Sequence, residues 1–286
     1  MRLYKIARRL PDDIWAIFEP ILPPVLYCGT GRKPAKNRDC FHGLLYVLIT
    51  GIGWEYVPRG FPCGKTIQHR LALWLQLDCF HHAWQQLAER YEQLRGINWD
   101  KILVDGSKKT AYKGGEDTGP SPVDRSKSGS AIHLATDEYG MPLGAVVTAA
   151  GANDGVQTQA VLESLVIKPP PPETPVADPD PRDLPHARAD GAYGNAPTQA
   201  RAQAAGFRML APKRGQTRVA GLGRIRSAVE RGHALLAQFG RIAHRLDRAT
   251  HRYLGWVQLA AAMIFLRAES HGFFGPRSLL NRCFFR

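Results

Sequence analysis

Apolar residues at helical spacing fill the first third of the chain. The pattern predicts helices at about 12–19, 39–50, 65–76 and 80–94, and proline or glycine ends the first two. A basic loop, residues 29–37, separates the first helix from the second. We therefore expect a small all-helical domain over residues 1–97.

After residue 100 the apolar period shortens to that of a strand. The pattern predicts strands at 102–105, 131–136, 143–148, 187–190 and 207–211. Helices are expected at 154–166, 197–205, 225–246 and 253–267. The second and third strands read as a hairpin, and the polar stretch 108–130 before them reads as a loop. This order predicts an α/β fold, a mixed five-stranded sheet with flanking helices, over residues 98–286.

One segment interrupts this second domain. Residues 168–186 contain eight prolines among nineteen residues and no apolar period. Such a composition is typical of an extended surface insertion.

Charge and cysteine content narrow the partners. Lys and Arg outnumber Asp and Glu by 38 to 25, for a net charge of +13, which favours nucleic acid as the partner, although a merely basic surface is the simpler alternative. The five cysteines form no CxxC pair and fit a reduced, cytosolic protein. No apolar run is long enough to span a bilayer, and the N-terminus lacks the apolar core of a signal peptide, so no membrane partner is expected.

The helices at 39–50 and 65–76 have the general form of a helix-turn-helix DNA reader. The second begins with basic and polar side chains outside its apolar stripe, at Lys65, His69 and Arg70. The connection is longer than in that motif, so a plain helical bundle with a basic outer face is a close alternative.

Three acidic residues stand where a fold could gather them. Asp105 ends the strand ILVDG, Asp190 ends the strand HARADG, and Glu230 lies on a helix four residues after Arg226. Parallel pairing of the first and fourth strands would place Asp105 beside Asp190 at one end of the sheet. Taken singly, each acid fits a turn or a salt bridge equally well.

Several longer stretches carry a family resemblance. They are DDIWAIFEPILP, LLYVLITGIGWEYVP, VDGSKKTAYKGG, GPSPVDRSKSGSAIHLATDEYGMPLGAVVTAAGANDG, ADGAYG and RSAVERGHALLAQFGRIAHRL. As an ordered set they resemble the DDE-type bacterial insertion-sequence transposases, in particular the insertion-sequence family numbered five. The resemblance covers nearly the whole chain and implies a ribonuclease-H-like core.

The resemblance also implies a chemistry. Asp105, Asp190 and Glu230 would be the catalytic, metal-binding triad for two Mg²⁺ (or Mn²⁺) ions, roughly 3.5–4 Å apart, that serve DNA cleavage and strand transfer. The expected partners are the terminal inverted repeats of the element, target DNA, and at least a second copy of the chain. Such an enzyme would work in the bacterial cytoplasm, on the nucleoid when bound to DNA.

The family signature around the glutamate is incomplete. Arg226 and Glu230 fit it, but Gly223 and Ala237 stand where the family has Tyr and Lys. The missing Lys puts a contact with the transposon-end phosphates in doubt. Arg241 is one candidate substitute, and a surface charge at the end of the helix is its simpler interpretation.

Further residues are expected around this centre. Asp154, His133 and Tyr193 lie near the catalytic strands and are candidates for supporting roles, although His133 more simply packs inside the sheet. Basic residues on the loops at this edge are expected to contact DNA phosphates: Lys108, Lys109, Lys113, Arg125, Lys127, Lys213 and Arg214, with Arg226 on the helix.

Two other functions remain open at this stage. One is a nuclease of the same fold that hydrolyses DNA without strand transfer. The other is an inactivated copy that acts as a DNA-binding repressor, an idea supported by the missing Tyr and Lys.

Overall fold

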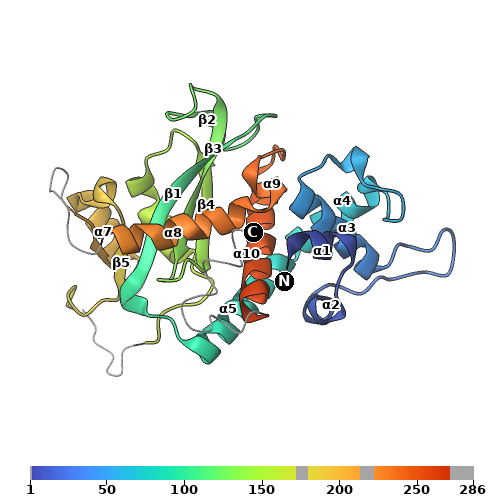
Figure 1. The fold of residues 1–286 in the computed structure, drawn as a ribbon, viewed down its shortest axis with the longest axis horizontal. Helices are drawn as coiled ribbons and strands as arrows, with labels where there is room; N and C mark the ends of the chain where they lie inside the picture. Colours follow the sequence, from blue (N-terminus) through green and yellow to red (C-terminus); the bar gives the residue numbers. More distant parts are fainter. Residues whose placement is uncertain (1, 172–179, 213–221, 271–286) are drawn as a thin grey trace.

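A mixed sheet with helices on both faces lies beside a group of helices from the N-terminal third (Figure 1). The computed structural model describes residues 2–171, 180–212 and 222–270, and for residues 222–226 it describes the backbone alone. This is the α/β architecture that the sequence predicts. No helix in these ranges is both long enough and apolar enough to cross a bilayer.

The sheet has six strands within the described ranges. They are β1 (Ile102–Thr110), β2 (Gly119–Pro120), β3 (Ser128–Thr136), β4 (Pro142–Ala149), β5 (His186–Arg188) and β6 (Arg208–Leu210). Their order is β4–β3–β1–β5–β6, with β2 paired to the first residues of β3. β3 is antiparallel to β1 and β4, whereas β5 is parallel to both β1 and β6. All five expected strands are present, and the two-residue β2 is an addition.

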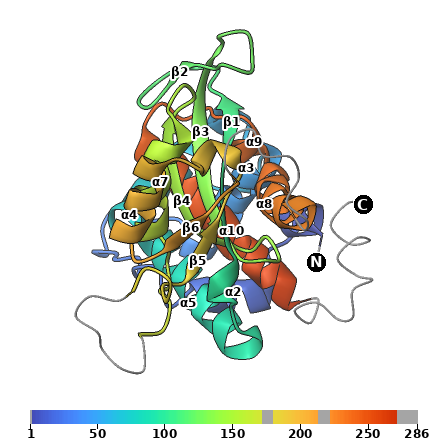
Figure 2. The same ribbon diagram turned by 90° about the vertical axis from the view of Figure 1, so that its left-hand side faces the viewer.

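Helices cover the two faces of the sheet differently (Figure 2). On one face α8 (Leu222–Ala237) crosses β1 and β3, and its Gly232 lies against Leu134 and Thr136. On the other face lie α6 (Thr158–Glu163), which follows the short 3₁₀ turn η3 (Asp154–Gln157), and α7 (Ala196–Ala204). Because strand side chains alternate between faces, β1 presents Asp105 toward α8 and Lys108 toward the opposite side.

The N-terminal third is helical, as expected. Its helices are α1 (Leu3–Arg8), α2 (Asp12–Phe18), α3 (Asn37–Thr50), α4 (Gly64–Gln76) and α5 (Cys79–Arg95), with 3₁₀ turns η1 (Trp54–Tyr56) and η2 (Trp99–Lys101). Helix α1 is not expected from the apolar pattern. Only Ile6 and Ala7 of its six residues are buried, too few to produce a helical apolar period.

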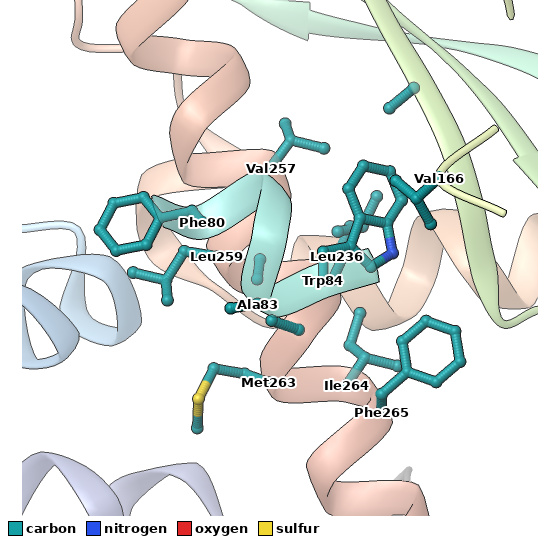
Figure 3. Close-up of a cluster of buried hydrophobic side chains, with 14 of the residues drawn as sticks. Phe80, Ala83, Trp84, Val166, Leu236, Val257, Leu259, Met263, Ile264 and Phe265 are labelled. Carbon is teal, nitrogen blue, oxygen red and sulfur yellow. The ribbon is translucent and has the colours of Figure 1, made fainter. Parts of the chain in front are cut away.

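The core runs without interruption from the N-terminal helices into the sheet. Helix α5 packs along α10 (Thr250–Glu269), so that Phe80 and Trp84 meet Met263 and Phe265 (Figure 3). The indole N–H of Trp84 also donates a hydrogen bond to the Pro142 carbonyl at 2.9 Å. Burial of each such side chain contributes roughly 1.5–3 kcal/mol, so this packing is a large part of the stability of the whole chain.

Two boundaries differ from the sequence expectation. Strand β1 continues to Thr110 because Lys109 and Thr110 pair with Ser130 and Gly129 of β3. The expectation that Lys108 and Lys109 lie on a loop is therefore wrong.

The long helix expected over 225–246 is broken. Helix α8 ends at Ala237, and the short α9 (Gly240–Ala243) follows. A Cβ atom on Gly240 would lie 2.8 Å from the backbone of Thr50 and Gly51, so the chain passes too close to the end of α3 for any side chain there. The helix breaks where this close approach is made.

Candidate active site

The register of β1 and β5 brings Asp105 and Asp190 to one end of the sheet. Ile102 pairs with Ala187 and Leu103 with Arg188, and the two aspartates follow two residues after Leu103 and Arg188 on their chains. The parallel pairing expected from the sequence is confirmed. Asp190 is exposed and caps the 3₁₀ turn η4 (Gly191–Tyr193), accepting a hydrogen bond from the Ala192 N–H at 2.8 Å.

Helix α8 places Glu230 above the same part of the sheet. Ala228 and Val229 pack on Leu103, and the ring of His233 lies 3.4 Å from the carbonyl oxygen of Asp105. Glu230 lies between these two contacts along the helix and is exposed. The helix therefore runs alongside the last residues before Asp105, on the face toward which Asp105 points.

Tyr193 connects the acids of this region. Its side chain is 1% exposed, and its hydroxyl has no hydrogen-bond partner among the described residues. Burial raises the pKa of Tyr193 above its usual value, and the charges of Asp154, Asp105 and Asp190 raise it further. An electrostatic effect from each carboxylate requires that all three lie near the hydroxyl.

The donor set suits a hard divalent cation, although the acids do not close on one position. Within residues 2–171, 180–212 and 222–270, no three His, Cys, Asp or Glu side chains form a group that could hold a metal ion. The available donors are carboxylate oxygens, which Mg²⁺ and Mn²⁺ prefer, and the orphaned Tyr193 hydroxyl marks a buried polar position among them. Uncompensated carboxylates repel each other, so closure of the group requires a cation.

A second set of charged groups lies on the opposite face of β1. The Nζ atom of Lys108 donates to Oδ1 of Asp154 at 2.9 Å, and Nδ1 of His133 lies 3.4 Å from the same oxygen. A Cβ atom on Gly106 would lie 2.5 Å from that oxygen, so the Asp154 carboxylate rests against the backbone next to Asp105. The sequence predicts Asp154 and His133 near the catalytic strands but gives no sign of their proximity to Lys108.

Both histidines of the region are neutral at neutral pH. Burial lowers the pKa of His133 to about 4, and Nε2 of its ring is 2.7 Å from the Thr148 hydroxyl. Burial also lowers the pKa of His233 to about 3, and the nearby charge of Lys109 adds to the effect. His133 is fully buried, so the simpler expectation, a histidine packed inside the sheet, is confirmed.

The basic residues expected on DNA divide into several groups. Lys113, Arg125 and Lys127 are exposed on the segment between β1 and β3. Lys108 is paired with Asp154, and burial lowers the pKa of Lys109. The described ranges do not include Lys213, Arg214 or the side chain of Arg226.

Near the N-terminus, Lys65 and His69 are exposed on α4. Arg70 is half-buried, and its Nη2 donates to the Ala35 carbonyl at 3.3 Å. Arg70 therefore fastens the basic loop 29–37 to α4.

Two arginines after α8 have structural roles that sequence reasoning missed. Arg241 is 3% exposed and forms an ion pair with Asp247, with Nε 2.9 Å from Oδ2. It is neither a substitute for the missing Lys nor a surface charge, and both sequence interpretations of it are wrong. Arg245 is also buried and donates to the carbonyls of Glu116 and Asp117, which anchors the segment between β1 and β3.

Two family models match this chain. Residues 10–84 match "Putative transposase of IS4/5 family (DUF4096)", and residues 100–265 match "Transposase DDE domain", which alone covers more than half of the chain. The chain belongs to the DDE transposase family. Transposases of this family are DNA-cleaving and strand-transferring enzymes with a ribonuclease-H-like core, and they generally depend on divalent metal ions.

Two proteins of Burkholderia cepacia are similar to the transposase. "Putative transposase for insertion sequence element IS402" is 31% identical over 150 residues, which covers 51% of this chain and 67% of that protein. "Insertion element IS402 uncharacterized 16.2 kDa protein" is 30% identical over 118 residues, which covers 40% of this chain and 80% of that protein. No solved structure matches the chain.

Proposed function

We propose that Asp105, Asp190 and Glu230 form the reaction centre with which this transposase cleaves DNA at the terminal inverted repeats of its element and joins the ends to target DNA. The observation that carries the proposal is the parallel register of β1 and β5, because it brings two acids far apart in sequence to one sheet end beneath α8. The proximity of His233 to the Asp105 carbonyl supports the place of Glu230.

The three carboxylates would hold two Mg²⁺ or Mn²⁺ ions. When bound, such ions activate the attacking oxygen and stabilise the leaving oxygen of an in-line displacement at phosphorus. The protein supplies the acids on rigid elements: Asp105 on a paired strand, Asp190 on a capped turn and Glu230 on a packed helix. The buried sheet end beneath them limits the access of water to the reacting phosphate.

DNA would lie along the basic surfaces on both sides of this centre. Lys113, Arg125 and Lys127 would contact phosphates near the cut, and Lys65 and His69 on α4 would contact the terminal repeat. Because two element ends must be held together during strand transfer, the active form would be at least a dimer. The chain would act on the nucleoid, where its substrate lies.

Replacement of one acid tests the reaction centre. Asp105→Asn should lower the rate of cleavage of end-containing DNA by more than about 100-fold, because cation stabilisation of the transition state worth several kcal/mol is removed. DNA binding, measured by mobility shift, should change little. A variant that cuts at the wild-type rate would exclude Asp105 from the reaction centre.

Asp100→Asn is the matched control. Asp100 precedes the other end of β1, its side chain is 67% exposed, and its substitution should leave cleavage unchanged. The same assay separates the transposase from a simple nuclease, because only strand transfer yields joined product. Cut DNA without any joined product, in wild-type protein with target DNA present, would contradict the proposal.

A further inference from the structure

The ion pair of Lys108 and Asp154 lies directly beside the proposed reaction centre. Only 17% of the Lys108 side chain and 30% of the Asp154 side chain are exposed, and the two charged atoms are 2.9 Å apart. The Asp154 carboxylate rests on the backbone of Gly106, the residue after Asp105. An ordinary surface ion pair would be more exposed and would not be fitted against a catalytic strand.

The Tyr193 hydroxyl points to a ligand among these acids. A buried hydroxyl without a partner costs about 1–3 kcal/mol, and Tyr193 is 1% exposed with no hydrogen-bond partner among the described residues. The carboxylates close enough to act on it electrostatically are those of Asp154, Asp105 and Asp190. Asp154 therefore lies near the same buried position as two members of the proposed triad.

The charge of Lys108 has a clear function in this setting. Several carboxylates around one buried position repel each other unless a cation is present. The Lys108 ammonium group provides that positive charge from the protein itself. A divalent ion would provide the same charge more strongly, and two cations cannot both occupy the Oδ1 side of Asp154.

Resting on the function proposed above, we propose that Asp154 is a fourth acidic ligand of the divalent ions and that Lys108 is the cation they displace from it. In the arrangement described, the Asp154 carboxylate is engaged by Lys108, so this acid becomes available to a metal ion only when the lysine moves away. Released from Asp154, the lysine remains on β1 next to the bound ions, where the phosphate of the DNA arrives.

Calorimetric titration of the full chain with Mn²⁺, without DNA, tests this exchange. Asp154→Asn should weaken Mn²⁺ binding by about tenfold or more, which corresponds to about 1.4 kcal/mol. Lys108→Gln should tighten it, because the competing cation is gone. Tighter binding cannot result from misfolding, so the Lys108 variant is informative whatever the stability of the Asp154 variant.

The matched control is Lys101→Gln. It removes another ion-paired lysine, bonded to Glu138 at 2.7 Å just before β1, and should leave Mn²⁺ binding unchanged. Unchanged or weaker binding in Lys108→Gln would overturn the proposal.

The double variant Asp154→Asn, Lys108→Gln separates a ligand from a distant charge. If Lys108 acts through Asp154, the double variant binds Mn²⁺ as weakly as Asp154→Asn alone. A return to wild-type affinity would mean that two charge changes simply cancel at a distance, and would overturn the proposal as well.

Asp105→Asn provides the reference for both proposals. Loss of Mn²⁺ binding in that variant, together with unchanged binding in Asp154→Asn, overturns the role of Asp154 alone. Unchanged binding in Asp105→Asn overturns the metal site of the proposed function, and this inference with it.

Discussion

Asp137 shows how a single buried charge ties two parts of the molecule together. It lies at the turn between β3 and β4, is 1% exposed, and accepts hydrogen bonds from the Tyr91 hydroxyl at 2.6 Å and the Met141 N–H at 2.8 Å. Burial raises the pKa of Asp137 from 3.8 to about 6, against the lowering effect of these hydrogen bonds. Because the folded-state pKa is raised, ionisation of Asp137 lowers stability as the pH rises from about 4 to about 6.

The contribution of Tyr91 should depend on pH. At pH 8 Asp137 is ionised, and Tyr91→Phe removes a hydrogen bond to a charged group, worth about 1.5–3 kcal/mol. At pH 5 Asp137 is protonated, and the same change should cost only about 1 kcal/mol. Urea unfolding at the two pH values measures the difference.

Tyr253→Phe is the control for this experiment. The Tyr253 hydroxyl is equally buried but donates to the Ile242 carbonyl at 2.8 Å, which does not titrate. Its removal should therefore cost the same free energy of unfolding at both pH values. An equal cost at both values for Tyr91→Phe as well would mean that Asp137 has the same charge at pH 5 and pH 8.

At this scale some residues can be placed from the sequence and others cannot. Asp105 and Asp190 each end an apolar run, so their positions at strand ends follow from the local pattern. The ion pair of Lys108 with Asp154 joins residues 46 positions apart and has no local signature. A loop is the natural expectation for Lys108 because Gly106 and Ser107 read as a strand end, whereas pairing with β3 extends the strand regardless of propensity.

At the scale of elements, the segment between β1 and β3 is the most prominent feature. It includes β2 and projects beyond the end of the sheet (Figures 1 and 2). The buried guanidinium of Arg245 binds it through the carbonyls of Glu116 and Asp117, so its position is fixed although its tip is exposed. A fixed basic projection is suited to hold a DNA backbone in register.

Neutralising this projection should change the salt dependence of DNA binding. In the triple variant Lys113→Gln, Arg125→Gln, Lys127→Gln, the slope of log affinity against log salt should become shallower by about 0.9 for each phosphate that the protein no longer neutralises. Fluorescence anisotropy with a labelled DNA end at several salt concentrations measures the slope.

A second triple variant serves as the comparison. Lys168→Gln, Arg182→Gln, Arg201→Gln removes the same charge from residues outside the proposed DNA surface and should leave the slope nearly unchanged. Equal slopes for both variants and the wild type would show that the projection does not bind DNA.

Helix boundaries show where prediction of elements fails. Apolar spacing continues from α8 into α9, so a single helix is the natural expectation from the sequence. The break is caused by the packing of Gly240 against Gly51, residues remote in sequence, and no local pattern encodes such packing. The short α1 escapes prediction for the complementary reason, since little of it is buried.

At the scale of the whole molecule, the assignment of residues 1–97 to a separate domain for binding the DNA ends stays a prediction. Helix α5, the last of that range, packs along α10, the last helix described. Trp84, Phe80 and their neighbours on α10 belong to one continuous core (Figure 3).

Two fragments should therefore behave differently. Residues 98–286 alone lack α5 and would leave the apolar side of α10 exposed, so we expect aggregation or a broad unfolding transition. Residues 78–286 retain α5 and should unfold more cooperatively. Near-ultraviolet circular dichroism and thermal melting compare the two. A sharp, identical transition for both fragments would show that the second domain is stable without α5.

The close passage of Gly240 against Gly51 has a consequence for the DNA. It leaves no slack between α3, with the basic α4 beside it, and the segment that follows α8. If α4 holds the terminal repeat, the distance from the recognised bases to the severed bond is built into the enzyme as on a ruler. Cut position would then be counted in base pairs by the protein itself, and an end of the wrong length would be cut at the wrong nucleotide.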